Sequence, residues 1–166
     1  TPSKREIDKL ASLYNKGNLQ EALILGDELA SRFSKDSNIA YIMGGICKAL
    51  GKYNEAISHY RKAVQLKSDF AKADKNIGNI QGGLGKYEEA IVSLNKAIEL
   101  DSNLSEAHYN LGNTLNGLER YEDAITSLNK AIELNPNFVV AHNNLGTALK
   151  ELGKLEKAIL SYQKAI

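Results

Sequence analysis

The sequence repeats itself at a fixed interval. The octapeptide SLNKAIEL occupies residues 93–100 and occurs again at 127–134. Related segments, HYRKAV at 59–64 and SYQKAI at 161–166, lie the same distance before the first copy and after the second. A period of this length, about 34 residues, is typical of arrays in which one small structural unit is stacked on the next, so it constrains the fold more than any other feature.

Written in rows of one period each, the chain is predicted to contain five units. They are a divergent helical hairpin at residues 3–36, then 37–70, 71–104 and 105–138, and finally 139–166, which is truncated at its C-terminal end. One column is alanine in every row: Ala22, Ala56, Ala90, Ala124 and Ala158. Another is glycine in four rows, Gly44, Gly78, Gly112 and Gly146. Such columns indicate helices that approach closely, because a larger side chain there costs about 1–3 kcal/mol.

Each row is predicted to form two helices. In the fourth row they are expected near residues 105–118 and 122–134, joined by a tight turn whose counterparts in other rows read LGK. Glycine in that turn suits the left-handed end of a helix. Serines at Ser34, Ser68 and Ser102 are expected to cap the following helices. No segment alternates apolar and polar residues long enough to indicate a strand, so the predicted fold class is all-α.

Composition limits the partners. The chain has 21 basic and 20 acidic residues, a net charge of +1, without the basic excess typical of proteins that bind nucleic acid or an anionic membrane. No apolar run approaches the length that a membrane-spanning helix needs, so membrane insertion is not expected. The single cysteine, Cys47, cannot form an internal disulfide and weakly favours a reducing, cytoplasmic location. Both ends of the sequence give the expectation of a piece of a longer protein.

The spacing of the repeated residues resembles the tetratricopeptide repeat (TPR). In the fourth row the pattern falls on His108, Leu111, Gly112, Leu115, Ala124, Leu128 and Pro136, with histidine in place of the usual first aromatic residue. The resemblance covers residues 3–166. It implies a right-handed superhelical solenoid of antiparallel helix pairs, with a concave groove that binds an extended peptide or a partner helix.

A helical wheel separates an apolar from a more polar face on each first helix, and the resemblance implies that the polar face lines the groove. The candidate peptide-binding residues are Lys72, Lys75, Asn76, Asn79, Tyr109, Asn110, Asn113, Asn143, Asn144 and Thr147. Asparagine recurs there although it is a poor helix residue. Its carboxamide matches the donors and acceptors of a peptide main chain. The alternative is that asparagine is simply the usual residue of the family at this position, where it bonds between neighbouring helices.

Two other features of the groove are a partly matched carboxylate-binding site and a pair of glycines. The carboxylate-binding arrangement of chaperone-adaptor TPR domains is matched by Lys75, Asn79 and Asn110, but Val140 and Asn144 occupy its two basic positions. Without those cations a carboxylate clamp is not expected. Glycines at residues 82–83 either open a pocket beside Tyr109 or only loosen the end of their helix.

Enzymatic interpretations have little support. His108 and His142 occupy a predicted helix-packing position and lack partners at metal-ligand spacing, while Cys47 falls in an apolar column. We therefore expect no catalytic residues, no metal and no cofactor. The predicted function is a non-catalytic protein-interaction scaffold. The alternatives are an N-terminal recruitment arm of a larger enzyme, such as a glycosyltransferase, or a homo-oligomer formed through the uncapped C-terminal repeat.

Overall fold

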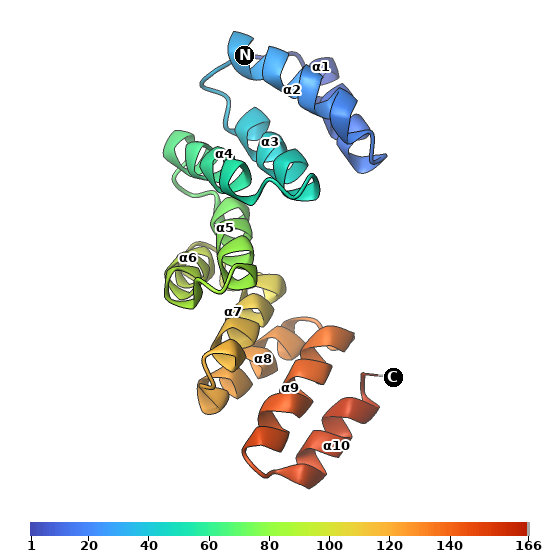
Figure 1. Ribbon diagram of the computed structural model, residues 1–166, viewed down its shortest axis with the longest axis vertical. Coiled ribbons are helices and arrows are strands. Elements are labelled where there is room, and N and C mark those ends of the chain that lie inside the picture. The colour runs from blue at the N-terminus through green and yellow to red at the C-terminus, as the bar shows by residue number, and fades with distance from the viewer. Residues whose placement is uncertain (166) are drawn as a thin grey trace. The chain divides into compact units, whose positions relative to one another are not determined.

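The computed structural model describes residues 1–165, and over those residues the chain forms ten α-helices and no strand (Figure 1). Ile166, the last residue of the fifth predicted unit, lies outside the described residues. The helices are α1 Lys4–Asn15, α2 Leu19–Arg32, α3 Ser37–Ala49, α4 Tyr53–Leu66, α5 Ala71–Gly83, α6 Tyr87–Leu100, α7 Ser105–Gly117, α8 Tyr121–Leu134, α9 Val139–Glu151 and α10 Leu155–Gln163.

The helices pair in chain order. Contacts join α1 to α2, α3 to α4, α7 to α8 and α9 to α10, and three second helices also meet the next first helix: α2 meets α3, α6 meets α7 and α8 meets α9. Short turns between the two helices of a pair make the partners antiparallel. The predicted all-α repeat solenoid is therefore confirmed as a fold class.

Left-handed residues close the turns inside the pairs. Gly17, Gly51, Gly85 and Gly153 have φ between 71° and 78°. In the α7–α8 turn the same position is Glu119, with φ of 57°. Glycine adopts this conformation freely, whereas a residue with a Cβ is strained there. The turn geometry is thus kept in the fourth row despite the loss of its glycine.

Helix N-termini differ from the expected serine caps. Asp36 caps α3, because its Oδ1 accepts hydrogen bonds from the backbone nitrogens of Asn38 at 2.9 Å and Ile39 at 3.0 Å. The N-cap residue of α7 is Leu104, which has no side-chain cap. The prediction was therefore wrong for Ser34 and Ser102, since each lies two residues before the N-cap and cannot reach the first helical amides from there.

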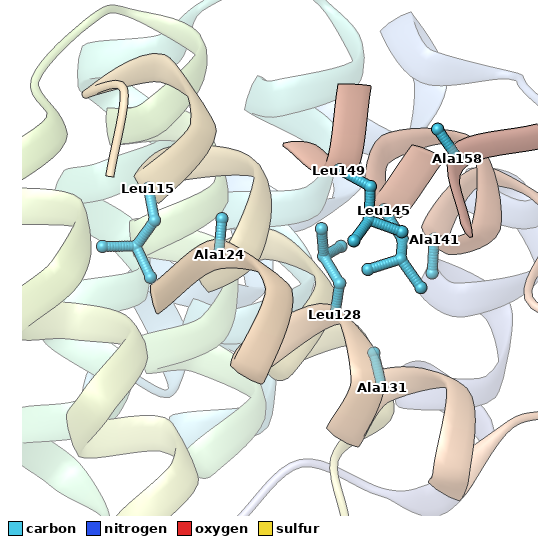
Figure 2. Packing of buried hydrophobic residues seen from close by; sticks show 8 residues of the cluster. All are labelled: Leu115, Ala124, Leu128, Ala131, Ala141, Leu145, Leu149 and Ala158. Atoms are coloured by element: carbon cyan, nitrogen blue, oxygen red, sulfur yellow. The ribbon is translucent and has the colours of Figure 1, made fainter. Parts of the chain in front are cut away.

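The chain divides into two compact units, residues 1–77 and 78–166, with the boundary inside α5. The first unit has a core formed by Leu10, Ala22, Leu29, Ile39, Met43 and Ile46. The second unit has its own core, in which Leu128 of α8 points toward Leu145 and Leu149 of α9 (Figure 2).

The predicted close approach of the helices is confirmed. The five alanines of the invariant column are between 0% and 2% exposed. A Cβ added at Gly112 would lie 2.6 Å from Cγ of Leu128 and 3.2 Å from the main-chain oxygen of Ala124. The small-residue columns are thus the places where the two helices of a pair touch.

Candidate functional site

Two asparagine pairs link consecutive first helices in the second unit. Asn79 of α5 donates from Nδ2 to Oδ1 of Asn110 on α7 over 3.3 Å. Asn144 of α9 donates from Nδ2 to Oδ1 of Asn113 on α7 over 3.1 Å. The two partners have the same separation along the chain in both pairs, so a contact of the same span is built twice in successive rows.

A third asparagine extends this arrangement. Asn116 donates from Nδ2 to the main-chain oxygen of Asn144 over 3.2 Å, while its Oδ1 is buried and lacks a partner within the described residues. We call the side chains of Asn79, Asn110, Asn113, Asn116 and Asn144 the carboxamide face.

The members of the carboxamide face differ in access to solvent. Asn113 is exposed, Asn79, Asn116 and Asn144 are partly buried, and Asn110 is only 8% exposed. A carboxamide has two N–H donors and one oxygen with two lone pairs, so one bond to a neighbouring helix does not exhaust it. The bonds between helices, expected as the alternative to ligand binding, are present; they fix the orientation of the side chains and leave further polar capacity on Asn113.

In the first unit, Asn76, which corresponds to Asn110 and Asn144, has a different hydrogen-bond partner. Asn76 donates from Nδ2 to the hydroxyl of Tyr41 over 3.3 Å. The position that would supply a pairing asparagine on α3 is Gly45, and a Cβ added there would lie 3.1 Å from the ring of Tyr14. The carboxamide pair of the second unit is therefore replaced by an asparagine–tyrosine bond.

The predicted site residues are thus distributed over both units. Three of them lie in the first unit: Lys72, which is exposed, and the partly buried Lys75 and Asn76. The other seven lie in the second unit: Asn79, Tyr109, Asn110, Asn113, Asn143, Asn144 and Thr147. Thr147 is exposed, and its hydroxyl lies 3.3 Å from that of Tyr162 on α10.

For the glycines at residues 82–83, a pocket beside Tyr109 and a loosened helix end both stay predictions. At Gly82 side chains of α7 and α6 lie close by. The nearest groups to a Cβ added at Gly82 are Oγ1 of Thr114 at 3.1 Å and Cβ of Ala90 at 3.9 Å. Tyr109 packs its ring against Phe138, with the centroids 4.9 Å apart. Sequence reasoning missed this aromatic pair because it considered the first helices alone and Phe138 lies just before α9.

His108 and His142 each form a hydrogen bond with a main-chain oxygen. Nε2 of His108 lies 3.0 Å from the main-chain oxygen of Ser102, and Nε2 of His142 lies 2.9 Å from that of Pro136. Each ring therefore ties the start of a first helix to the turn before it. His142 is buried as predicted, whereas His108 is partly exposed.

The Cys47 thiol and the metal-ligating side chains are the candidates for reactive chemistry. Cys47 is fully buried, and burial is the main cause that raises the pKa of its thiol. Among residues 1–165, no three His, Cys, Asp or Glu side chains gather in a way that could hold a metal ion. Within the same described part, none of the helices is long and apolar enough to cross a membrane.

Comparison with sequence families identifies the class of protein. A model described as TPR repeat matches residues 44–85 and 83–118, and two models described as tetratricopeptide repeat match residues 105–138 and 127–160. The matched segments together extend from residue 44 to residue 160. The chain belongs to the tetratricopeptide repeat family.

Solved structures share the fold. A MamA structure comprising residues 41 to the end, from Desulfovibrio magneticus RS-1, is 24% identical, covers 98% of this chain and 92% of its own, and has a TM-score of 0.87. A crystal structure of YrrB, described as a TPR protein with an unusual peptide-binding site, is 23% identical, covers 99% of this chain and 85% of its own, and has a TM-score of 0.79. No curated protein sequence matches this chain significantly.

Proposed function

We propose that the chain is a non-catalytic scaffold that binds an extended peptide along the carboxamide face of its second unit. The observation that carries this proposal is the pair of cross-helix bonds, Asn79 to Asn110 and Asn144 to Asn113. Side chains held in this way lose little conformational freedom when a ligand arrives, which reduces the entropic cost of binding.

The chemistry of the face favours a main chain as its ligand. Asn113 is exposed, and its Oδ1 accepts one hydrogen bond from Asn144. The two N–H groups of the Asn113 carboxamide are suited to donate to a carbonyl oxygen of the peptide. Exposed Asn143 and Thr147 on α9 add further donors and acceptors. A surface of neutral hydrogen-bonding groups recognises the backbone of a peptide and depends little on its charge.

Membership of the TPR family supports a protein or peptide as the partner. The related fold of YrrB is described with a peptide-binding site, although the likeness at 23% identity concerns the fold. The remaining predicted residues, Lys72, Lys75 and Asn76, are proposed as contacts of the first unit. The recruitment arm of a larger enzyme stays a prediction, since no described residue tests it.

The proposal is tested by selection from a random peptide library with three proteins. They are the parent, the double variant Asn113→Ala/Asn144→Ala, and the control Asn95→Ala/Asn129→Ala, whose two asparagines are exposed on the second helices α6 and α8. Alanine favours helix, so each variant is expected to fold, which circular dichroism checks.

We expect the parent and the control to retain the same peptides, and the carboxamide-face variant to bind them about tenfold more weakly or worse, as for the loss of about 1.4 kcal/mol. Equal binding by all three proteins would place the site elsewhere. If the parent retains no peptide, the scaffold proposal itself fails.

A second candidate, self-association, is favoured by the apolar surface of α10. Leu155 is 59% exposed and Ile159 is 56% exposed, and the two lie one turn apart on the same side of the helix. The corresponding residues of the row before, Tyr121 and Ile125, are partly buried, and Ile125 packs on the core of the second unit. We propose that a second copy of the chain covers the exposed pair.

A further inference from the structure

Two aromatic pairs recur two rows apart, one in each unit. In the first unit Tyr41 stacks on Phe70, with the ring centroids 4.8 Å apart and an interplanar angle of 26°. In the second unit Tyr109 meets Phe138 at 4.9 Å and 42°. The row between them has Lys75 in the tyrosine position and Leu104 in the phenylalanine position, so the pair occurs in alternate rows.

Each pair is built in the same way. The tyrosine projects from a first helix, α3 or α7, and the phenylalanine immediately precedes the first helix of the next row, α5 or α9. All four rings are partly exposed. Each of these residues therefore contributes to packing and also keeps part of its surface exposed to solvent.

In the second unit the aromatic pair lies on the same face as the asparagines. Asn113 and Asn144 are bonded to each other, and the residues four positions earlier on the two helices are Tyr109 and Val140. Residues four apart share one side of a helix, one turn apart. Tyr109 and Val140, the latter 47% exposed, thus continue the carboxamide face with apolar surface.

The combination of groups is unlike a site that recognises charge. Aromatic rings and an exposed valine offer apolar contact, while the tyrosine hydroxyl and the Asn113 carboxamide offer donors. Proline-containing segments in the polyproline II conformation present apolar rings and carbonyl acceptors, lack amide donors at proline, and lose little entropy on binding. Grooves lined by aromatic rings with neighbouring donors recognise this conformation.

We propose that the Tyr109–Phe138 pair is an anchor site for a proline side chain of an extended peptide, and that Tyr41–Phe70 is its counterpart in the first unit. This inference rests on the proposed function, because the anchored peptide continues along the carboxamide face. The counterpart differs in its surroundings, since Tyr41 also packs against Tyr60 and accepts a hydrogen bond from Asn76, and Nζ of Lys67 lies 5.5 Å from the centroid of the Phe70 ring. The residue matching Val140 is Lys72, so the first unit favours an acidic residue next to the proline.

The test uses a short host peptide of serine and asparagine that carries proline at every third position, which aligns the proline rings along one edge of the polyproline II helix. Matched peptides carry alanine or leucine instead of proline. Fluorescence anisotropy gives the affinity for the parent, for Tyr109→Leu and Phe138→Leu, and for the control Tyr53→Leu, which removes an exposed tyrosine of α4. Thermal unfolding checks that each variant is folded, and two independent anchor variants guard against one that is not.

We expect the parent and Tyr53→Leu to bind the proline peptide about tenfold more tightly than either matched peptide, and both anchor variants to lose most of that preference. Equal binding of the proline and leucine peptides, or unchanged preference in both anchor variants, would overturn the proline anchor.

The failure of this inference is separable from that of the proposed function. If peptides from the random library bind in a manner that depends on Asn113 and Asn144 but not on Tyr109, the carboxamide face is a peptide site and the aromatic anchor is wrong. If neither library peptides nor the proline peptide bind the parent, both proposals are overturned.

Discussion

At the scale of single residues, the turn inside the fourth row carries a strained backbone. Glu119 has φ of 57°, and Gly85 has φ of 73° at the same place one row earlier. A Cβ added at Gly85 would meet no atom within 4 Å, so the difference between the two residues there is conformational and not one of packing. The left-handed conformation costs a residue with a Cβ roughly 1–2 kcal/mol. Glycine avoids this strain, but it loses more conformational entropy on folding, which offsets part of the advantage.

We predict that Glu119→Gly raises the free energy of unfolding by about 0.5–1 kcal/mol, since the relief of strain exceeds the entropic cost. The reciprocal change, Gly85→Glu, should lower it by a similar amount. Chemical denaturation of both variants measures the effect. An unchanged or lower stability of Glu119→Gly would contradict the assignment of strain to this turn.

We expect His59 to make the free energy of unfolding depend on pH. This side chain of α4 is partly buried, and desolvation is the main cause that lowers its pKa below 6.5; the carboxylates of Asp27 and Glu55 oppose the shift, and Lys62 adds to it. The unfolded state therefore takes up a proton before the folded state does as the pH falls. Stability contributed by neutral His59 is present above pH 6.5 and decreases as the pH falls below it.

The replacement His59→Gln should reduce the loss of stability between pH 7.5 and pH 5, because glutamine does not titrate. Urea unfolding of the parent and the variant at both pH values provides the comparison. The same acid-side loss in the two proteins would show that His59 does not contribute.

At the scale of helices, contact between the two members of a pair depends on glycine. A Cβ at Gly112 of α7 would come within 2.6 Å of Leu128 on α8, whereas a Cβ at Gly83 of α5 would meet nothing within 4 Å. The same substitution should therefore have opposite effects at these two helical positions.

We predict that Gly112→Ala destabilises the protein by about 1–3 kcal/mol through overpacking. Gly83→Ala should stabilise it by about 0.5–1 kcal/mol, because alanine favours helix over glycine. Thermal or chemical denaturation of the two variants is a direct comparison. If Gly112→Ala is neutral, the helices of the pair are not in close contact there.

The helices and their contacts were largely predictable from the sequence. The period, the alanine column and the glycine of each turn report backbone geometry, which changes little from row to row, and Ala22 and Ala124 are fully buried as expected. The site was less predictable, because it depends on side-chain partners. In the second row Gly45 occupies the position of Asn79 and Asn113, and Asn76 bonds to Tyr41 and not to an asparagine. Nothing in the repeat pattern indicates this hydrogen bond.

At the scale of the whole molecule, stability is expected to be local. Each unit has its own hydrophobic core, and the helix contacts within each unit are mainly between elements adjacent in the chain. In such an array an apolar face is buried by a neighbouring element, and Leu155 and Ile159 of α10 are 59% and 56% exposed in the described part of the chain.

Self-association through α10 predicts an average mass that rises with protein concentration in sedimentation equilibrium. The double variant Leu155→Lys/Ile159→Lys should remove this rise, because charged side chains oppose burial of the face. The control Ile24→Lys changes a residue of α2 that is 71% exposed and should leave the rise intact. A parent that stays monomeric at all concentrations would contradict the proposed contact.

The most direct test of the central claim is the location of a bound peptide by nuclear magnetic resonance. A peptide selected on the parent is titrated into ¹⁵N-labelled protein, and the backbone and side-chain amide signals are followed. If the peptide binds to the carboxamide face, we expect the signals of Asn113 and Asn144 to shift. The signals of Asn95 and Asn129, which lie on the second helices, should not shift. Shifts confined to the second helices, with Asn113 and Asn144 unaffected, would show that the peptide binds elsewhere.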